Sequence, residues 1–170
     1  SSLFSIIIQD STLAGNSAGT GGGVYSLLGD LTLQNTVVQD NRALSDTGGY
    51  GGGLRLSQAA LTATNVTGAR NTAFLRGGFL RLDEVSTAGL TDCTVEHNTA
   101  GDTGGGVSNY GGSTLRVYES TFRFNNATEG GSEVYTDNAD CYARNSWFED
   151  LGSNAGDYVL HAEQGKLVLD

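Results

Sequence analysis

Residues 31–43 read LTLQNTVVQDNRA, and residues 52–54 read GGL. Leu31 and Leu33 flank one variable residue, which is the period of two that puts both side chains on one face of a β-strand. Asn35 follows where a bend is needed, because asparagine tolerates left-handed backbone and bonds its own main chain. The valines beyond it predict a second inward-facing strand, and the glycine pair permits a tight corner before a third. This stretch therefore predicts one coil of a β-solenoid.

The same pattern recurs along the chain. Five asparagines align at spacings of 25, 30, 27 and 27 residues, and Leu151 holds the sixth place 26 residues further on. The aligned asparagines are Asn16, Asn41, Asn71, Asn98 and Asn125. Glycine pairs precede an apolar residue at Gly22-Gly23-Val24, Gly52-Gly53-Leu54, Gly77-Gly78-Phe79 and Gly105-Gly106-Val107. A repeat of this length is one supersecondary unit that buries its apolar side only by stacking on its neighbours.

These columns predict an all-β fold, a right-handed single-stranded parallel β-helix of about six coils. Residues 1–170 form one β-helix segment, and we expect further coils of a longer protein at one or both ends. The handedness follows from the rule that parallel strands are joined by right-handed crossovers. Helical repeats are excluded, because they need apolar stripes at intervals of three and four over ten or more residues.

The coil motif resembles the FxxN and GGA(I/L/V) repeats of the chlamydial polymorphic outer-membrane proteins and their relatives. Residues 122–125 (Phe-Arg-Phe-Asn) match FxxN, and Leu13 or Val38 stands in place of the phenylalanine in other coils. The glycine motif ends in Gly-Val or Gly-Leu here, so the likeness is to the wider group. It covers nearly the whole chain. The resemblance implies a pectate-lyase-like β-helix used as a surface passenger or adhesin, whose repeats are structural and supply no catalytic site.

The charge of the chain restricts its partners. Nine basic and nineteen acidic residues give a net charge of −10. This disfavours nucleic acids and anionic membrane surfaces, where Lys and Arg supply most of the affinity. No apolar run approaches the length of a membrane span, and no signal-peptide pattern is present. We therefore expect no nucleic-acid partner and no direct membrane insertion.

Two polar columns have alternative interpretations. The aligned asparagines either form an internal amide ladder or bind a row of ligands or ions, and we favour the ladder because buried amides need partners. The second column stands six places earlier and holds acidic and amide residues: Asp10, Asn35, Asn65, Asp92, Glu119 and Asn145. It could bind Ca²⁺, but only three members are charged, which favours the capping of turns.

The outward positions of the first strand give one candidate binding surface. Arg116 and Tyr118 in the fifth coil and Tyr142 and Arg144 in the sixth are expected to form a contact patch for a sugar or a protein. Ordinary packing between coils is the alternative. A polysaccharide lyase or hydrolase would need paired carboxylates, or an acidic calcium cluster beside a base, and these columns hold no such pair.

Other residues give weaker signals. His97 and His161 have no second ligand at zinc spacing, and Cys93 and Cys141 fall in different columns too far apart for a disulfide. We therefore expect no metal and no cofactor. The insertion at residues 44–50 is expected to project as a loop that carries recognition.

The sequons Asn65-Val66-Thr67 and Asn126-Ala127-Thr128 predict two glycosylation sites, and Asn126 should point outward. They give mild support to a secreted protein. We expect an extracellular or cell-surface structural or adhesive module and no enzyme. Its expected partners are flanking coils or copies of the same protein, other surface proteins, and glycans. The alternative is a β-helix that binds or degrades polysaccharides, with its site partly outside this chain.

Overall fold

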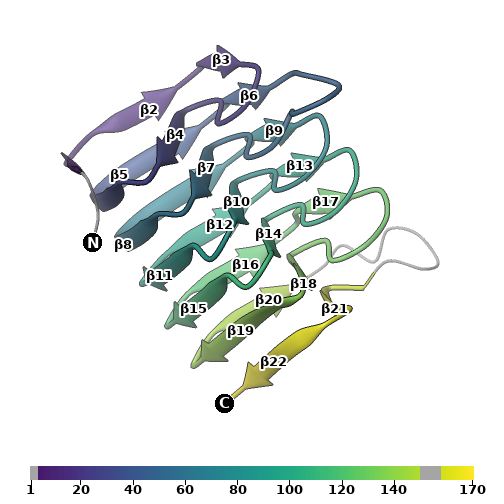
Figure 1. Cartoon of the computed structure of the whole chain (residues 1–170). Coiled ribbons are helices and arrows are strands. Elements are labelled where there is room, and N and C mark those ends of the chain that lie inside the picture. The colour runs from purple at the N-terminus through teal and green to yellow at the C-terminus, as the bar shows by residue number, and fades with distance from the viewer. Residues whose placement is uncertain (1–3, 150–157) are drawn as a thin grey trace.

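The computed structural model describes residues 4–149 and 158–170. In these residues every regular element is a β-strand, and parallel strands stack in about six coils (Figure 1). The predicted all-β parallel solenoid is confirmed.

Three sheets run along the solenoid in the described part of the chain. The largest contains β1 (Ser5–Gln9), β2 (Thr12–Ala14), β5 (Asp30–Gln39), β8 (Ala60–Ala69), β11 (Thr87–Thr91), β12 (Thr94–Glu96), β15 (Thr114–Tyr118), β16 (Thr121–Arg123), β19 (Ala139–Arg144), β20 (Trp147–Glu149) and β22 (Gly165–Leu169). The second contains β4 (Val24–Leu27), β7 (Leu54–Ser57), β10 (Leu80–Asp83), β14 (Val107–Tyr110), β18 (Val134–Asp137) and β21 (Leu160–Ala162). The third contains β3 (Ser17–Ala18), β6 (Arg42–Ala43), β9 (Thr72–Ala73), β13 (Thr99–Ala100) and β17 (Asn126–Ala127).

The third sheet is a feature that the sequence pattern did not predict as a strand. Each of its two-residue strands follows a ladder asparagine and carries an alanine that aligns with the alanine of the next coil. Ala43, Ala73 and Ala100 are fully buried. A strand this short leaves little periodicity to detect, so the sequence shows only the alanine column.

The corner after the first strand is made by the acidic and amide column. All six members have φ between 48° and 54°, and they are Asp10, Asn35, Asn65, Asp92, Glu119 and Asn145. Asparagine and aspartate are enriched in this left-handed region because their short polar side chains can bond the local backbone. In β5 and β8 the corner lies within one long strand, so the first two expected strands merge there.

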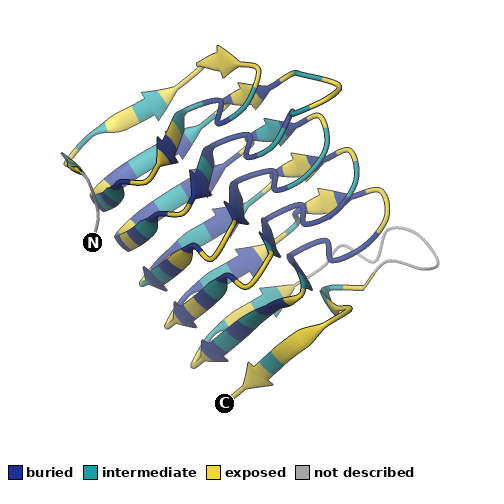
Figure 2. Cartoon of the chain, viewed as in Figure 1, coloured by how far each residue is buried: buried dark blue, intermediate teal, exposed yellow. Residues whose placement is uncertain are grey.

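Burial follows the predicted alternation along the strands. Leu31, Leu33 and Val38 are buried, and the corresponding residues of later coils stack beneath them in one hydrophobic core. The middle coils have buried inward faces, whereas the first coil and β22 are largely exposed (Figure 2). Each buried leucine contributes roughly 1.5–3 kcal/mol relative to an exposed one.

The alignment of the third glycine pair was wrong by one residue. Leu80 pairs with both Leu54 and Val107, so Phe79 occupies the place held by Gly53 and Gly106 in the neighbouring coils. The reason lies in the second-strand column, where Gly68 replaces the usual valine or phenylalanine. A Cβ added at Gly68 would lie 2.5 Å from the Phe79 ring. The large residue has exchanged places with the small one, and the core stays filled.

Candidate functional site

The five aligned asparagines form an internal ladder. Asn71 accepts hydrogen bonds on its Oδ1 from the Asn41 backbone N–H at 3.1 Å and from Asn41 Nδ2 at 3.0 Å. Its own Nδ2 donates to the Val38 carbonyl at 2.9 Å and to Asn98 Oδ1 at 3.0 Å. Corresponding Nδ2-to-Oδ1 bonds join Asn16 to Asn41 and Asn98 to Asn125. The ladder amides use their donors and acceptors on one another and on the backbone. Few of these groups therefore remain for a row of ligands or ions.

The ladder ends at a buried glutamate that the sequence analysis missed. Val107 pairs with Val134, so Glu133 occupies the place of Gly106, with its side chain inside the coil. Its carboxylate accepts the Asn125 backbone N–H at 3.1 Å and a second hydrogen bond from Asn125 Nδ2. Glu133 thus replaces the carboxamide that the next coil would supply. The sequence signal that could have revealed this role is a polar residue, Glu133, at a position where the preceding coil has glycine.

The acidic and amide column makes hydrogen bonds along the outside of the corner. Asn35 Nδ2 donates to Asp10 Oδ1 at 2.9 Å, and Asn65 Nδ2 donates to Asn35 Oδ1 at 3.0 Å. Within residues 4–149 and 158–170, no group of three or more His, Cys, Asp or Glu side chains is arranged to hold a metal ion. These contacts give the column a part in shaping the corner.

The structure brings the four predicted patch residues together. Arg116 lies opposite Tyr142 and Tyr118 opposite Arg144 on the paired strands β15 and β19. The Arg116 guanidinium stands 5.7 Å from the centroid of the Tyr142 ring. The Tyr142 hydroxyl donates to Asp140 Oδ2 at 3.2 Å. We call Arg116, Tyr118, Tyr142 and Arg144 the tyrosine–arginine patch.

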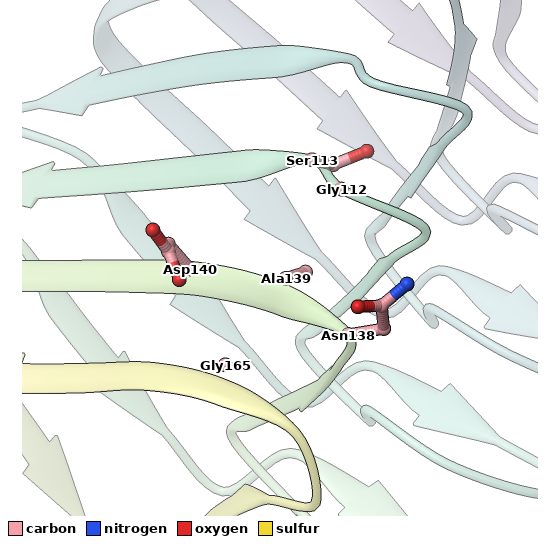
Figure 3. Close-up of a pocket in the computed structure, with 6 residues that line it drawn as sticks. All are labelled: Gly112, Ser113, Asn138, Ala139, Asp140 and Gly165. Carbon is pink, nitrogen blue, oxygen red and sulfur yellow. The ribbon is translucent and has the colours of Figure 1, made fainter.

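Two shallow hollows lie at the ends of β19, on either side of Tyr142. The first, of about 200 Å³, is lined by Tyr118, Tyr142, Ala143, Arg144, Val168 and Asp170. The second, of about 210 Å³, is lined by Gly112, Ser113, Asn138, Ala139, Asp140 and Gly165. Figure 3 shows Asn138, Ala139 and Asp140 at the start of β19, between Ser113 of the coil above and Gly165 of the coil below. Both hollows suit surface contact better than enclosure of a ligand.

No protein-family model, curated protein or solved structure matches the chain. The likeness to the chlamydial repeats therefore rests on the motif alone. The described residues form no helix long and apolar enough to span a membrane.

The remaining candidate residues lie outside the patch, although Cys141 directly precedes Tyr142 in β19. Cys93 and Cys141 are both buried and free, and burial raises the pKa of the Cys141 thiol to about 12, so it is a poor nucleophile. His97 packs against Phe124 with ring centroids 5.3 Å apart. His161 lies 5.1 Å from the ring of Tyr135.

Both sequon asparagines are exposed, but their backbone conformations differ. Asn126 lies in the short strand β17, and Asn65 occupies a left-handed corner where its amide bonds Asn35. The insertion at residues 44–50 only partly projects. Its last residue, Tyr50, turns back so that its ring lies 5.0 Å from the Arg55 guanidinium.

A second cluster on the outer face of the second sheet was missed. The Arg81 guanidinium lies 3.9 Å from the centroid of the Tyr110 ring and 5.3 Å from that of Tyr50. Asp83 Oδ1 accepts from Arg81 Nε at 2.7 Å, and Asp83 Oδ2 accepts from Arg55 Nε at 3.0 Å. Arg81 is only 5% exposed although it points away from the core. Contacts of this kind depend on where long side chains extend, so the repeat in the sequence does not predict them.

Removing the carboxylate of this cluster should destabilise the fold. In Asp83→Ala, Arg81 would stay buried without its ion pair, and we expect the free energy of unfolding to fall by about 3 kcal/mol. Chemical denaturation measures the change. The exposed pair Arg70–Asp40 offers the matched control, because Asp40→Ala there should cost under about 1 kcal/mol. Equal losses in the two variants would contradict this account.

The carboxyl groups of Asp102 and Glu129 give a prediction for how the stability of the fold depends on pH. A hydrogen bond that the protonated Glu129 carboxyl donates to Asp102, together with the negative charge of Asp102, raises the pKa of Glu129 above its ordinary value of 4.5. The folded protein therefore favours the protonated acid, and the stability that Glu129 contributes is lost as the pH rises through its raised pKa. We expect Glu129→Gln to raise the thermal midpoint at pH 7 and to leave it unchanged at pH 3.

The control for this prediction is Asp46→Asn, which makes the same charge change in an exposed turn. Thermal melts of the two variants and the parent protein should be recorded at both pH values. A stabilisation by Glu129→Gln that persists at pH 3, or one that Asp46→Asn reproduces, would argue against the proposed repulsion.

Proposed function

We propose that this chain is an extracellular structural or adhesive module that offers a rigid, repeated surface for assembly or for contact with a cell surface. The observation that carries the proposal is the amide ladder. Polar groups that are hydrogen-bonded inside a core hold neighbouring coils in one register. A network in which every donor and acceptor has a partner makes the structure more rigid. The resemblance of the coil motif to the chlamydial surface proteins supports the same function.

The tyrosine–arginine patch is the contact surface we assign to this module. Tyrosine and arginine are enriched at protein interfaces, because each combines a large apolar area with directional hydrogen bonding. Tyr118 and Arg144 are exposed, so both are accessible to a partner. The partners we propose are flanking coils or copies of the same protein and other surface proteins.

Electron microscopy of the native protein tests this function. Antibody raised against this chain would label the intact protein in its native material. We expect the label on rods or regular fibres at or outside the cell surface, and absent after competition with excess purified chain. Label confined to the cell interior, on particles without any rod or fibre, would overturn the proposal.

The second candidate function is the binding or degradation of a polysaccharide. It is favoured by the hollow that Tyr118 and Tyr142 line, because an aromatic face next to polar groups suits the mixed surface of a sugar. Among the described residues, each of the two hollows is lined by a single carboxylate, Asp170 in the first and Asp140 in the second, whereas glycoside hydrolysis uses a pair of carboxyl groups. Binding without cleavage is therefore the form of this candidate that we favour.

A further inference from the structure

Strand β11 contains a glycine that the fold does not require. Gly89 lies on the outward face of the strand and has no positive φ. A Cβ added there would meet nothing closer than the Leu61 carbonyl oxygen at 4.0 Å. By contrast, a Cβ at Gly78 would lie 2.1 Å from the Gly105 carbonyl oxygen. Glycine within a strand lowers its stability, and it often marks a place where another molecule approaches the backbone closely.

The neighbours of Gly89 make a shallow floor with a polar rim. Thr62 and Arg116 lie on either side of it in the adjacent strands. Thr87 and Thr91 stand two places away along β11, since alternate residues share a face. In the described part of the chain, none of these threonine hydroxyls bonds another protein group, so they remain available to a ligand. We call Thr62, Thr87, Gly89 and Thr91 the Gly89 floor.

Arg116 connects this floor to the tyrosine–arginine patch. It is exposed, and its guanidinium stands over the Tyr142 ring. Arg55, Arg81 and Arg123 each pair with a carboxylate, whereas Arg116 pairs with none among the described residues. Its guanidinium therefore has hydrogen-bond donors to offer at the surface. From Gly89 to Tyr142 the face crosses two strand spacings, or about 10 Å.

We propose that the Gly89 floor and the patch beside it bind an uncharged glycan chain. Threonine hydroxyls and the Arg116 donors match sugar hydroxyls, and the tyrosine rings match the apolar faces of the sugars. A peptide strand is disfavoured, because β11 is already paired on both edges and has no backbone groups left for strand addition. A polyanion is disfavoured by the net charge of −10 and by Asp140 and Asp170 beside the patch.

The test is a binding titration with neutral and charged oligosaccharides. This inference rests on the second candidate function. The neutral probes are gluco-, xylo- and manno-oligosaccharides, and the charged probes are galacturonate and sulfated oligosaccharides. We expect at least one neutral probe to bind, and Gly89→Val to weaken it at least tenfold by filling the floor. Valine suits a strand, so the thermal midpoint of this variant should not fall.

Thr32→Val is the matched control, because Thr32 occupies the same outward column above the floor, beyond Thr62. It should change the affinity by less than twofold. If Gly89→Val leaves the binding of neutral oligosaccharides intact, the proposed location of the site is wrong, while glycan binding as a function stands. Binding of charged probes alone, lost in salt, would overturn the ligand class. No binding of any probe would overturn both the site and the second candidate function.

Discussion

Asn71→Ala is expected to lower the free energy of unfolding by about 5 kcal/mol, because each buried polar group left without a partner costs about 1–3 kcal/mol. The change removes the acceptor for the Asn41 backbone N–H and for Asn41 Nδ2. It also removes the donor to the Val38 carbonyl and one donor to Asn98. All three partner residues are buried, so water reaches them poorly. Urea denaturation of the purified variant measures the loss.

The control for the ladder is Asn126→Ala. Asn126 is the same type of residue in an exposed strand, where substitutions usually change stability by no more than about 0.5 kcal/mol. A loss of that size in Asn71→Ala as well would show that the ladder does not hold the coils together.

Phe79→Ala is expected to cost about 4 kcal/mol, the usual range for deleting a buried aromatic ring. The ring is 1% exposed and fills the space beside Gly68. Gly68→Val alone should also destabilise the fold, by about 1–3 kcal/mol, because its side chain would overlap the ring. The double variant Gly68→Val with Phe79→Gly restores the arrangement of the neighbouring coils.

A double-mutant cycle with Phe79→Gly, Gly68→Val and the double variant measures this exchange. We expect the double variant to be more stable than either single variant, with a coupling energy above about 2 kcal/mol for two residues in direct contact. Additive losses would mean that the two positions do not share one space, and the explanation of the misaligned glycine pair would be wrong.

The repeat predicted the architecture because its columns follow from local rules. Paired apolar residues such as Leu31 and Leu33, a residue suited to left-handed backbone after them, and an inward asparagine each recur once per coil. Stacking then places equal residues beside one another, so strand pairing and the partners of Asn71 follow from the alignment. The same reasoning put Arg116 opposite Tyr142.

What the sequence did not predict depends on exceptions to the columns. Gly68 and Phe79 look like two unrelated irregularities until the fold brings them into contact. Glu133 was not singled out from the sequence, because its role as the end of the ladder depends on which way its side chain points. Arg81 in a strand contacts Tyr50 of the 44–50 insertion. Because the insertion lies outside the repeat, the alignment of the coils could not predict this contact.

The central claim is that a buried amide ladder holds the coils in register. Hydrogen exchange of the asparagine side-chain amides, followed by nuclear magnetic resonance on the folded protein, tests it most directly. We predict strong protection of the Nδ2 protons of Asn41, Asn71 and Asn98, and exchange at the rate of a free amide for Asn126. Rapid exchange at all four residues would contradict the ladder and, with it, the rigid module proposed here.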